Sequence, residues 1–207
     1  TDAASLRKAG ADIVETGSIA NAAFRNASAI PFYEGKLDVE AGYTAWSPSN
    51  SNIMNVAGAY NINDRFGVAA GFSYGMLPAY DVTDGAGISK GTYKPSDMQI
   101  NAGFAYKFLP YLSAGINIGY ASSNLAEGHS YGAVTSDVFL MGKFSDFKVA
   151  AGVSNLGTGI TSASGAKFKL PTAVSVGAGY ENTFADKHGI SANIDADYFL
   201  AEGIAIA

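Results

Sequence analysis

Residues 97–108 read DMQINAGFAYKF and alternate polar or small residues with apolar ones throughout. A period of two is typical of a β-strand, in which successive side chains point to opposite faces. One face carries Met98, Ile100, Ala102, Phe104, Tyr106 and Phe108, and the other carries Asp97, Gln99, Asn101, Gly103, Ala105 and Lys107. The stretch therefore predicts a strand with one face suited to hydrocarbon and the other suited to water.

The same alternation recurs along most of the chain. It appears in residues 37–46, 54–62, 66–74, 112–120, 134–140, 147–154, 170–180 and 190–198. About nine strands of roughly ten residues have the length and pattern of strands that cross a bilayer at a tilt. A soluble β-sandwich is the alternative, but soluble strands usually have about 5–6 residues. We therefore expect an all-β fold, an antiparallel transmembrane up-and-down β-barrel.

The predicted connections alternate in length. Short ones fall at residues 61–65, 109–111, 145–146 and 182–188, and longer ones at 75–95, 121–132 and 155–167, with a shorter connection at 47–52 on the same side as the longer ones. Outer-membrane barrels alternate tight periplasmic turns with longer external loops. The pattern predicts an integral protein of the outer membrane of a Gram-negative bacterium, with its first strand starting at the periplasmic side near Lys36.

The composition agrees with a barrel in contact with outer-membrane lipid. The 207 residues are 48% hydrophobic and 15% charged, with a mean hydropathy of +0.10. The net charge of -5 gives no electrostatic footprint for nucleic acid. Outward aromatic residues predict two interfacial girdles, with Tyr60, Phe66, Tyr106, Phe108 and Tyr180 beside the short connections and Tyr43, Tyr74, Tyr120 and Tyr198 at the other ends.

Residues 1–35 lack the period of two. This segment is rich in alanine, permits short helical turns, and reaches Pro31, which disfavours helix at Ile30. Because it precedes a periplasmic strand end, we expect either a plug folded into the lumen or a loose periplasmic arm. The barrel domain then comprises residues 36–207.

The last residues, 203–207, predict a strand that starts without crossing the membrane. An incomplete strand would leave unpaired backbone groups in hydrocarbon, at several kcal/mol each. Two interpretations stay open: about ten strands of a barrel that continues beyond residue 207, or a ten-stranded barrel with a short last strand.

Polar residues at inward positions are the candidates for lining the lumen: Asp38, Glu40, Asp97, Gln99, Asn101, Asp137, Lys148, Asn193, Asp195 and Asp197. They either fill the barrel by pairing with one another and with a plug, or line a permeation route. We favour filling. Small inward residues leave room for a plug or a bound ligand, namely Gly67, Gly71, Gly103, Gly115 and Gly119.

The sequence gives little support for catalysis, so we expect neither enzymatic activity nor a cofactor. His129 and His188 fall in connections on opposite sides of the predicted membrane, and the chain has no Cys. The stretch 81–85 contains two aspartates but lacks the ligand series of a calcium loop, so we expect no metal there. An Asp-Gly turn explains it.

The longest predicted connection contains apolar residues that suit an external docking site: Met76, Leu77, Pro78 and Tyr80. They suit docking of another molecule or entry of a hydrophobic one. Packing over the barrel mouth is the alternative.

The N-terminal segment carries a family resemblance. AGADIV at 9–14, NAAFRNASAI at 21–30 and the alternating strands that follow resemble the PorV/PorQ branch of the FadL-like outer-membrane barrels. Family members commonly read Asn-Pro-Ala-Gly-Leu where this chain has NASAI at 26–30, so the proline is absent. The resemblance implies a barrel of about fourteen strands with an N-terminal plug.

The resemblance leaves three functions open. The first is a non-enzymatic component of an outer-membrane assembly such as type IX protein secretion, with other outer-membrane or secreted proteins as partners. The second is a FadL-like transporter of hydrophobic small molecules. The third is a purely structural barrel.

Overall fold

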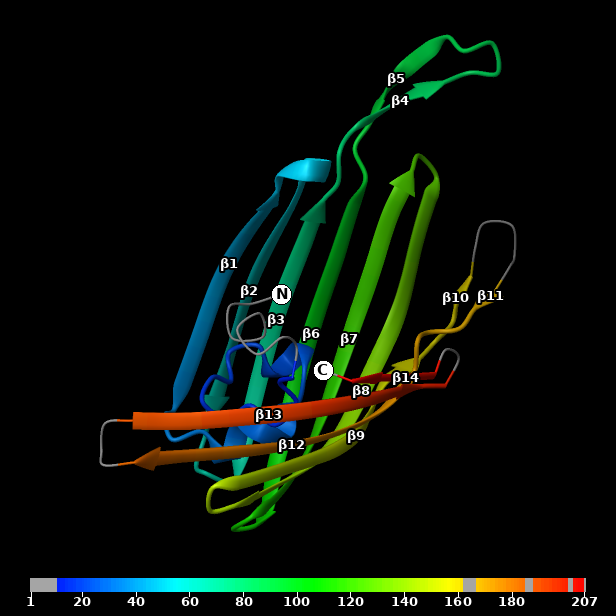
Figure 1. Ribbon diagram of the computed structural model, residues 1–207. Coiled ribbons are helices and arrows are strands. Elements are labelled where there is room, and N and C mark those ends of the chain that lie inside the picture. Colours follow the sequence, from blue (N-terminus) through cyan, green and yellow to red (C-terminus); the bar gives the residue numbers. More distant parts are fainter. Residues whose placement is uncertain (1–10, 162–166, 185–187, 201–202, 207) are drawn as a thin grey trace.

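The computed structural model describes residues 11–161, 167–184, 188–200 and 203–206, and these form an all-β fold with short 3₁₀ turns. Ten strands make one antiparallel sheet in the order β1-β2-β3-β6-β7-β8-β9-β12-β13-β14, which confirms the predicted up-and-down arrangement (Figure 1). The strands of the sheet are β1 (Leu37–Trp46), β2 (Ser51–Asn61), β3 (Phe66–Met76), β6 (Ser96–Leu109), β7 (Leu112–Ala126), β8 (His129–Phe144), β9 (Phe147–Gly157), β12 (Ala173–Phe184), β13 (His188–Phe199) and β14 (Gly203–Ile206).

Two small ribbons are inserted between strands of the sheet. The first pairs β4 (Tyr80–Thr83) with β5 (Ser89–Tyr93), and the second pairs β10 (Ile160–Thr161) with β11 (Lys167–Phe168). The β4–β5 ribbon projects beyond the end of the sheet (Figure 1). We call this the loop end, and the opposite end the tight-turn end.

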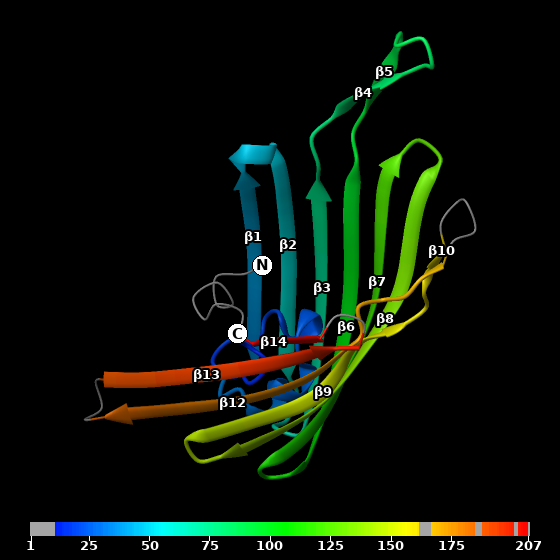
Figure 2. The same cartoon turned by 45° about the vertical axis from the view of Figure 1, so that its right-hand side comes forward.

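The sheet is strongly curved, and the N-terminal segment (residues 11–35) lies against its concave, inner face. This segment contains η1 (Ala22–Phe24) and η2 (Ala27–Phe32), whereas η3 (Ser47–Ser49) joins β1 to β2. Figure 2 shows β12 and β13 passing across the concave side, so the segment lies between them and β1–β3. The sheet is not closed in the part of the chain described, because β1 and β14 stand at its two ends.

The alternation of residue types is also an alternation of environment. In β7, Ser113, Gly115 and Asn117 are buried, while Ile116 and Ile118 between and beside them are exposed. The cross-strand register pairs inward residues with inward residues and outward residues with outward ones, so one face of the sheet is consistently apolar. The apolar residues face outward, on the convex side.

The predicted tight connections at 109–111 and 145–146 are confirmed, with Ser145 at a φ of 54°. The prediction of a long connection at residues 121–132 was wrong. There β7 and β8 stay paired up to Ala126 and His129, and the turn needs only residues 127–128. Gly128, at a φ of 72°, takes the left-handed conformation that this turn requires.

No helix in the described ranges is long and apolar enough to cross a membrane.

Candidate functional site

The contact between the N-terminal segment and the inner face is the most elaborate polar site of the described structure. Asp38 on β1 binds the segment through one carboxylate oxygen, Oδ2. This oxygen accepts hydrogen bonds from the backbone N–H of Ile19 at 2.8 Å, the N–H of Ala20 at 3.1 Å and the Ser18 hydroxyl at 3.0 Å. Two residues along the same face, Glu40 accepts from the side-chain amide of Asn21 at 3.1 Å. Both carboxylates therefore satisfy donors of the segment.

Asparagines in the middle of the sheet bind the carbonyl groups of the same segment. The Asn101 amide donates to Ala23 O at 3.0 Å, and the Asn117 amide donates to Ala22 O and Arg25 O, each at 3.1 Å. Ala22 O also accepts from Arg25 N within η1, so these amides add side-chain hydrogen bonds from the sheet to the backbone of the segment.

The segment's own geometry depends on Asn26, the N-cap of η2. Its side-chain oxygen accepts from Ser28 N at 2.9 Å, and its side-chain nitrogen donates to Ile13 O at 2.8 Å. Asn26 therefore joins both halves of the segment. On the sheet, Ser113 donates to Ser28 O at 2.6 Å and holds the start of η2 against β7.

Two lysines anchor the segment toward the tight-turn end. Lys107 Nζ donates to Pro31 O at 2.7 Å and lies 5.2 Å from the centroid of the Phe32 ring. The Lys148 side chain is 2% exposed and donates to Glu181 at 2.7 Å and to Thr16 Oγ1 at 3.2 Å. A buried ammonium is tolerated only when it is paired in this way.

β13 completes the site from the other side of the segment. Asp195 Oδ2 accepts from Ile13 N at 2.9 Å, and Asn193 donates to Ala11 O at 3.2 Å. Each pair is 182 residues apart in sequence. The segment thus ties the first strand of the sheet to the ninth.

Inward glycines make room for this segment. A Cβ atom added to Gly67 would collide with Ile30, one at Gly71 with the Phe24 ring, and one at Gly115 with the backbone of Ser28. At Gly103, a Cβ would lie 3.2 Å from Ala27 Cβ and 2.6 Å from Asn117 Oδ1, and at Gly119 it would lie 2.8 Å from Asn101 Oδ1. The five small positions noted in the sequence therefore accommodate the segment or the side chains that hold it.

Not every predicted lumen residue contacts the segment. Of the ten candidates, Asp38, Glu40, Asn101, Lys148, Asn193 and Asp195 do. Asp97 instead accepts from the Ser123 hydroxyl at 2.5 Å, and Asp137 accepts from Asn155 N at 2.8 Å. Gln99 is half-buried beside Asp97, and Asp197 is half-buried on β13.

The contacts of Ser113, Asn117 and Lys107 with the N-terminal segment were not predicted from the sequence. The signal was present, because the alternation in β7 already placed Ser113 and Asn117 on the face opposite Ile116. What the pattern lacked was the identity of their partners, which come from the N-terminal segment.

The predicted external docking residues are partly ordered into strands. Met76 ends β3, and Tyr80 begins β4. The Tyr80 hydroxyl donates to Leu125 O at 2.9 Å, its ring lies 5.9 Å from that of Tyr93, and Leu77 N donates to Pro95 O at 3.1 Å. Residues 77–79 link β3 to the ribbon and residues 94–95 lead back to β6, so the predicted docking residues support the base of the ribbon.

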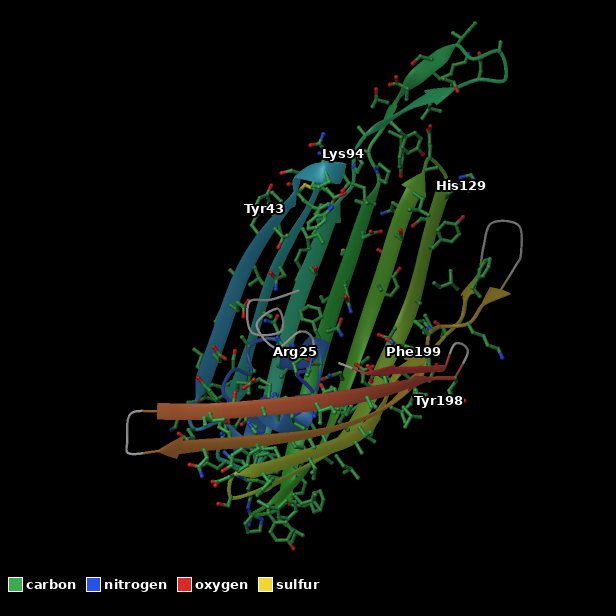
Figure 3. All side chains as sticks on the ribbon, in the orientation of Figure 1. Arg25, Tyr43, Lys94, His129, Tyr198 and Phe199 are labelled. Atoms are coloured by element: carbon green, nitrogen blue, oxygen red, sulfur yellow. The ribbon has the colours of Figure 1, made fainter. Side chains whose placement is uncertain are left out.

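The two histidines, and the aspartates of the 81–85 stretch, were not expected to form a catalytic or metal site. His129 begins β8 at the loop end, where Figure 3 shows it, and His188 begins β13 at the other end. Asp84 sits in the β4–β5 turn, where the N–H groups of Ile88 and Ala86 lower the pKa of its carboxyl from the usual 3.8. Within the described ranges, no cluster of acidic or histidine residues is suited to a metal ion.

The convex face is apolar from one end of the sheet to the other. Val39 on β1 is 62% exposed, Ile118 on β7 is 55% exposed and Ile194 on β13 is 57% exposed. Aromatic rings gather beside the tight turns, where Phe66 stacks on Tyr106 at 4.9 Å and Phe147 lies 5.0 Å from Tyr180. Tyr43 and Tyr198 lie nearer the opposite ends of their strands (Figure 3).

No protein-family model matches this sequence, and comparison with curated proteins likewise gives no match.

Proposed function

We propose that this chain forms the wall of a transmembrane β-barrel in the outer membrane of a Gram-negative bacterium, with the N-terminal segment as a plug in its lumen. One observation carries the proposal: large apolar side chains are exposed at outward positions on every strand from β1 to β9 in the main sheet, and on β12 and β13. Water would drive such a surface to aggregate, whereas bilayer hydrocarbon would cover it.

A barrel in a membrane needs partners for the edges of β1 and β14. Among the described residues, β1 pairs only with β2, and β14 only with β13. Each unpaired backbone group in hydrocarbon costs several kcal/mol, so a closed barrel requires that these edges pair with each other or with further strands. The intact mass of the natural protein, compared with 21.3 kDa, tests whether the same polypeptide supplies them.

Within this barrel, we infer a non-enzymatic role in an outer-membrane assembly, as in PorV/PorQ-like components of type IX secretion. The sequence resemblance at residues 21–30 supports this inference, and these residues fold into the turns that contact the inner face. The β4–β5 ribbon, which extends beyond the sheet at the loop end, offers a surface for a partner protein.

A FadL-like transporter of hydrophobic small molecules is the second candidate. A cavity of about 330 Å³ at the loop end favours it, because the exposed Ile53 lies in its lining. A structural barrel is the third candidate and requires neither partner nor ligand.

Purification from native membranes in mild detergent distinguishes the three functions. The assembly role predicts a stoichiometric protein partner that is lost when residues 80–93 are replaced by a short glycine-serine linker. Retained hydrophobic molecules without a partner would favour transport instead. A protein that carries neither would favour the structural barrel.

A further inference from the structure

The inner face is uncovered near the loop end. Figure 1 shows β2, β3, β6 and β7 rising well above the N-terminal segment. The inward row nearest the loops joins Ile53, Gly75, Asp97 and Ser123 across these strands. All four residues line the cavity of about 330 Å³.

Apolar side chains form one part of this cavity. Ile53 is 43% exposed on the inner face, whereas Phe139 and Met141 on the same face are buried. Leu77 lines the same cavity, and Gly75, which pairs with Ile53, leaves space beside it. An exposed apolar group inside a polar vestibule is costly in water, and an apolar ligand would cover it.

One carboxylate provides the charge of the cavity. In β2, β3, β6 and β7, all of whose residues the structure describes, Asp97 and Lys107 are the only charged residues at inward positions. Lys107 is far along β6 and is bonded to Pro31 O. Asp97 is exposed, and Ser123 donates to one of its oxygens, so the other oxygen is available to a ligand.

We propose that this cavity binds an amphiphilic cation. Its alkyl chain lies against Ile53 and Leu77, and its ammonium group pairs with Asp97. The negative charge of Asp97 attracts a cation and repels an alkyl carboxylate or sulfate of the same length. This inference rests on the proposed barrel, because only a closed wall would make the loop end a vestibule.

Tryptophan fluorescence tests the inference directly. Trp46 is the only tryptophan of the chain, and it pairs with Ser51, which lines the cavity. The full chain in lipid nanodiscs is titrated with decyltrimethylammonium, decyl maltoside and decyl sulfate, each below its micelle concentration. We expect saturable changes in Trp46 emission that require the least decyltrimethylammonium and the most decyl sulfate.

Two variants separate the charge from the apolar contact. Asp97→Asn should weaken binding of the cation about tenfold and remove its advantage over the maltoside, whereas Asp81→Asn on the distant ribbon should change nothing. Ile53→Ser should weaken both ligands alike. Equal binding of cation and sulfate by a protein correctly inserted in nanodiscs would overturn this inference alone. A chain that remains soluble without lipid or detergent would overturn the proposed barrel as well.

Discussion

Asp38→Asn tests how firmly the N-terminal segment is held to the sheet. The substitution preserves shape but removes the charge from an oxygen that accepts three hydrogen bonds, at 2.8, 3.0 and 3.1 Å. Hydrogen bonds to charged groups contribute about 1.5–3 kcal/mol each. Because Asp38 is half-buried and one oxygen accepts from all three donors, we expect the free energy that holds the segment to the sheet to fall by only about 1–2 kcal/mol in total.

This loss should appear as local opening of the segment. A change of one or two kcal/mol alters an equilibrium by a factor of roughly 5–30, so the amide hydrogens of Ile19 and Ala20 should exchange faster by that factor. Hydrogen–deuterium exchange measures this effect. Asp97→Asn is the matched control, because it removes a carboxylate from the same face without touching the segment. Equal exchange in the wild type and Asp38→Asn, or equal acceleration in Asp38→Asn and Asp97→Asn, would show that the Asp38 carboxylate does not hold the segment.

Three other perturbations address the packing, the convex face and the ribbon. Gly115→Val should expel the start of η2, because its Cβ would collide with the backbone of Ser28; faster amide exchange across residues 27–32 is expected, and unchanged exchange would contradict the account of the glycines. Ile100→Arg should destabilise the protein in bilayers by about 2–4 kcal/mol in urea unfolding, whereas Gln99→Arg on the opposite face should cost clearly less. In a ¹³C titration, the carboxyl of Asp84 should show a pKa below 3.8. The ionised carboxylate stabilises the turn at pH values above 3.8, and this stabilisation is lost as the pH falls through the lowered pKa. A titration at the usual value would contradict the hydrogen bonds drawn from Ile88 and Ala86.

The strands were predictable because their two faces meet unlike surroundings. The alternation at 97–108 locates β6 to within one residue at each end, Ser96–Leu109. The same alternation placed Asp38, Asn101 and Lys148 on the inner face. Their partners were not predictable, because no local pattern links Ile13 to Asp195, 182 residues away.

Elements that lack one buried and one apolar exposed face were the ones missed. The paired ends of β7 and β8 at residues 121–132 carry mostly small and polar residues, so no hydrophobic period marks them as strands. The β4–β5 ribbon likewise stands away from the sheet, and tyrosine contacts and backbone pairing hold it rather than a buried face. Backbone hydrogen bonds extend these strands, and such backbone pairing leaves no alternation of side-chain types in the sequence.

The most direct test of the central claim is spin-label accessibility along β6 in reconstituted bilayers. Because the chain has no Cys, single cysteines at positions 98, 100, 102, 104 and 106 can each be labelled alone. If the convex face contacts lipid, all five positions have high accessibility to lipid-soluble oxygen and low accessibility to a water-soluble nickel complex, and labels at positions 97 and 99 show the reverse. Ready access of the nickel complex to positions 100, 102 and 104 would place the convex face in water and contradict the barrel.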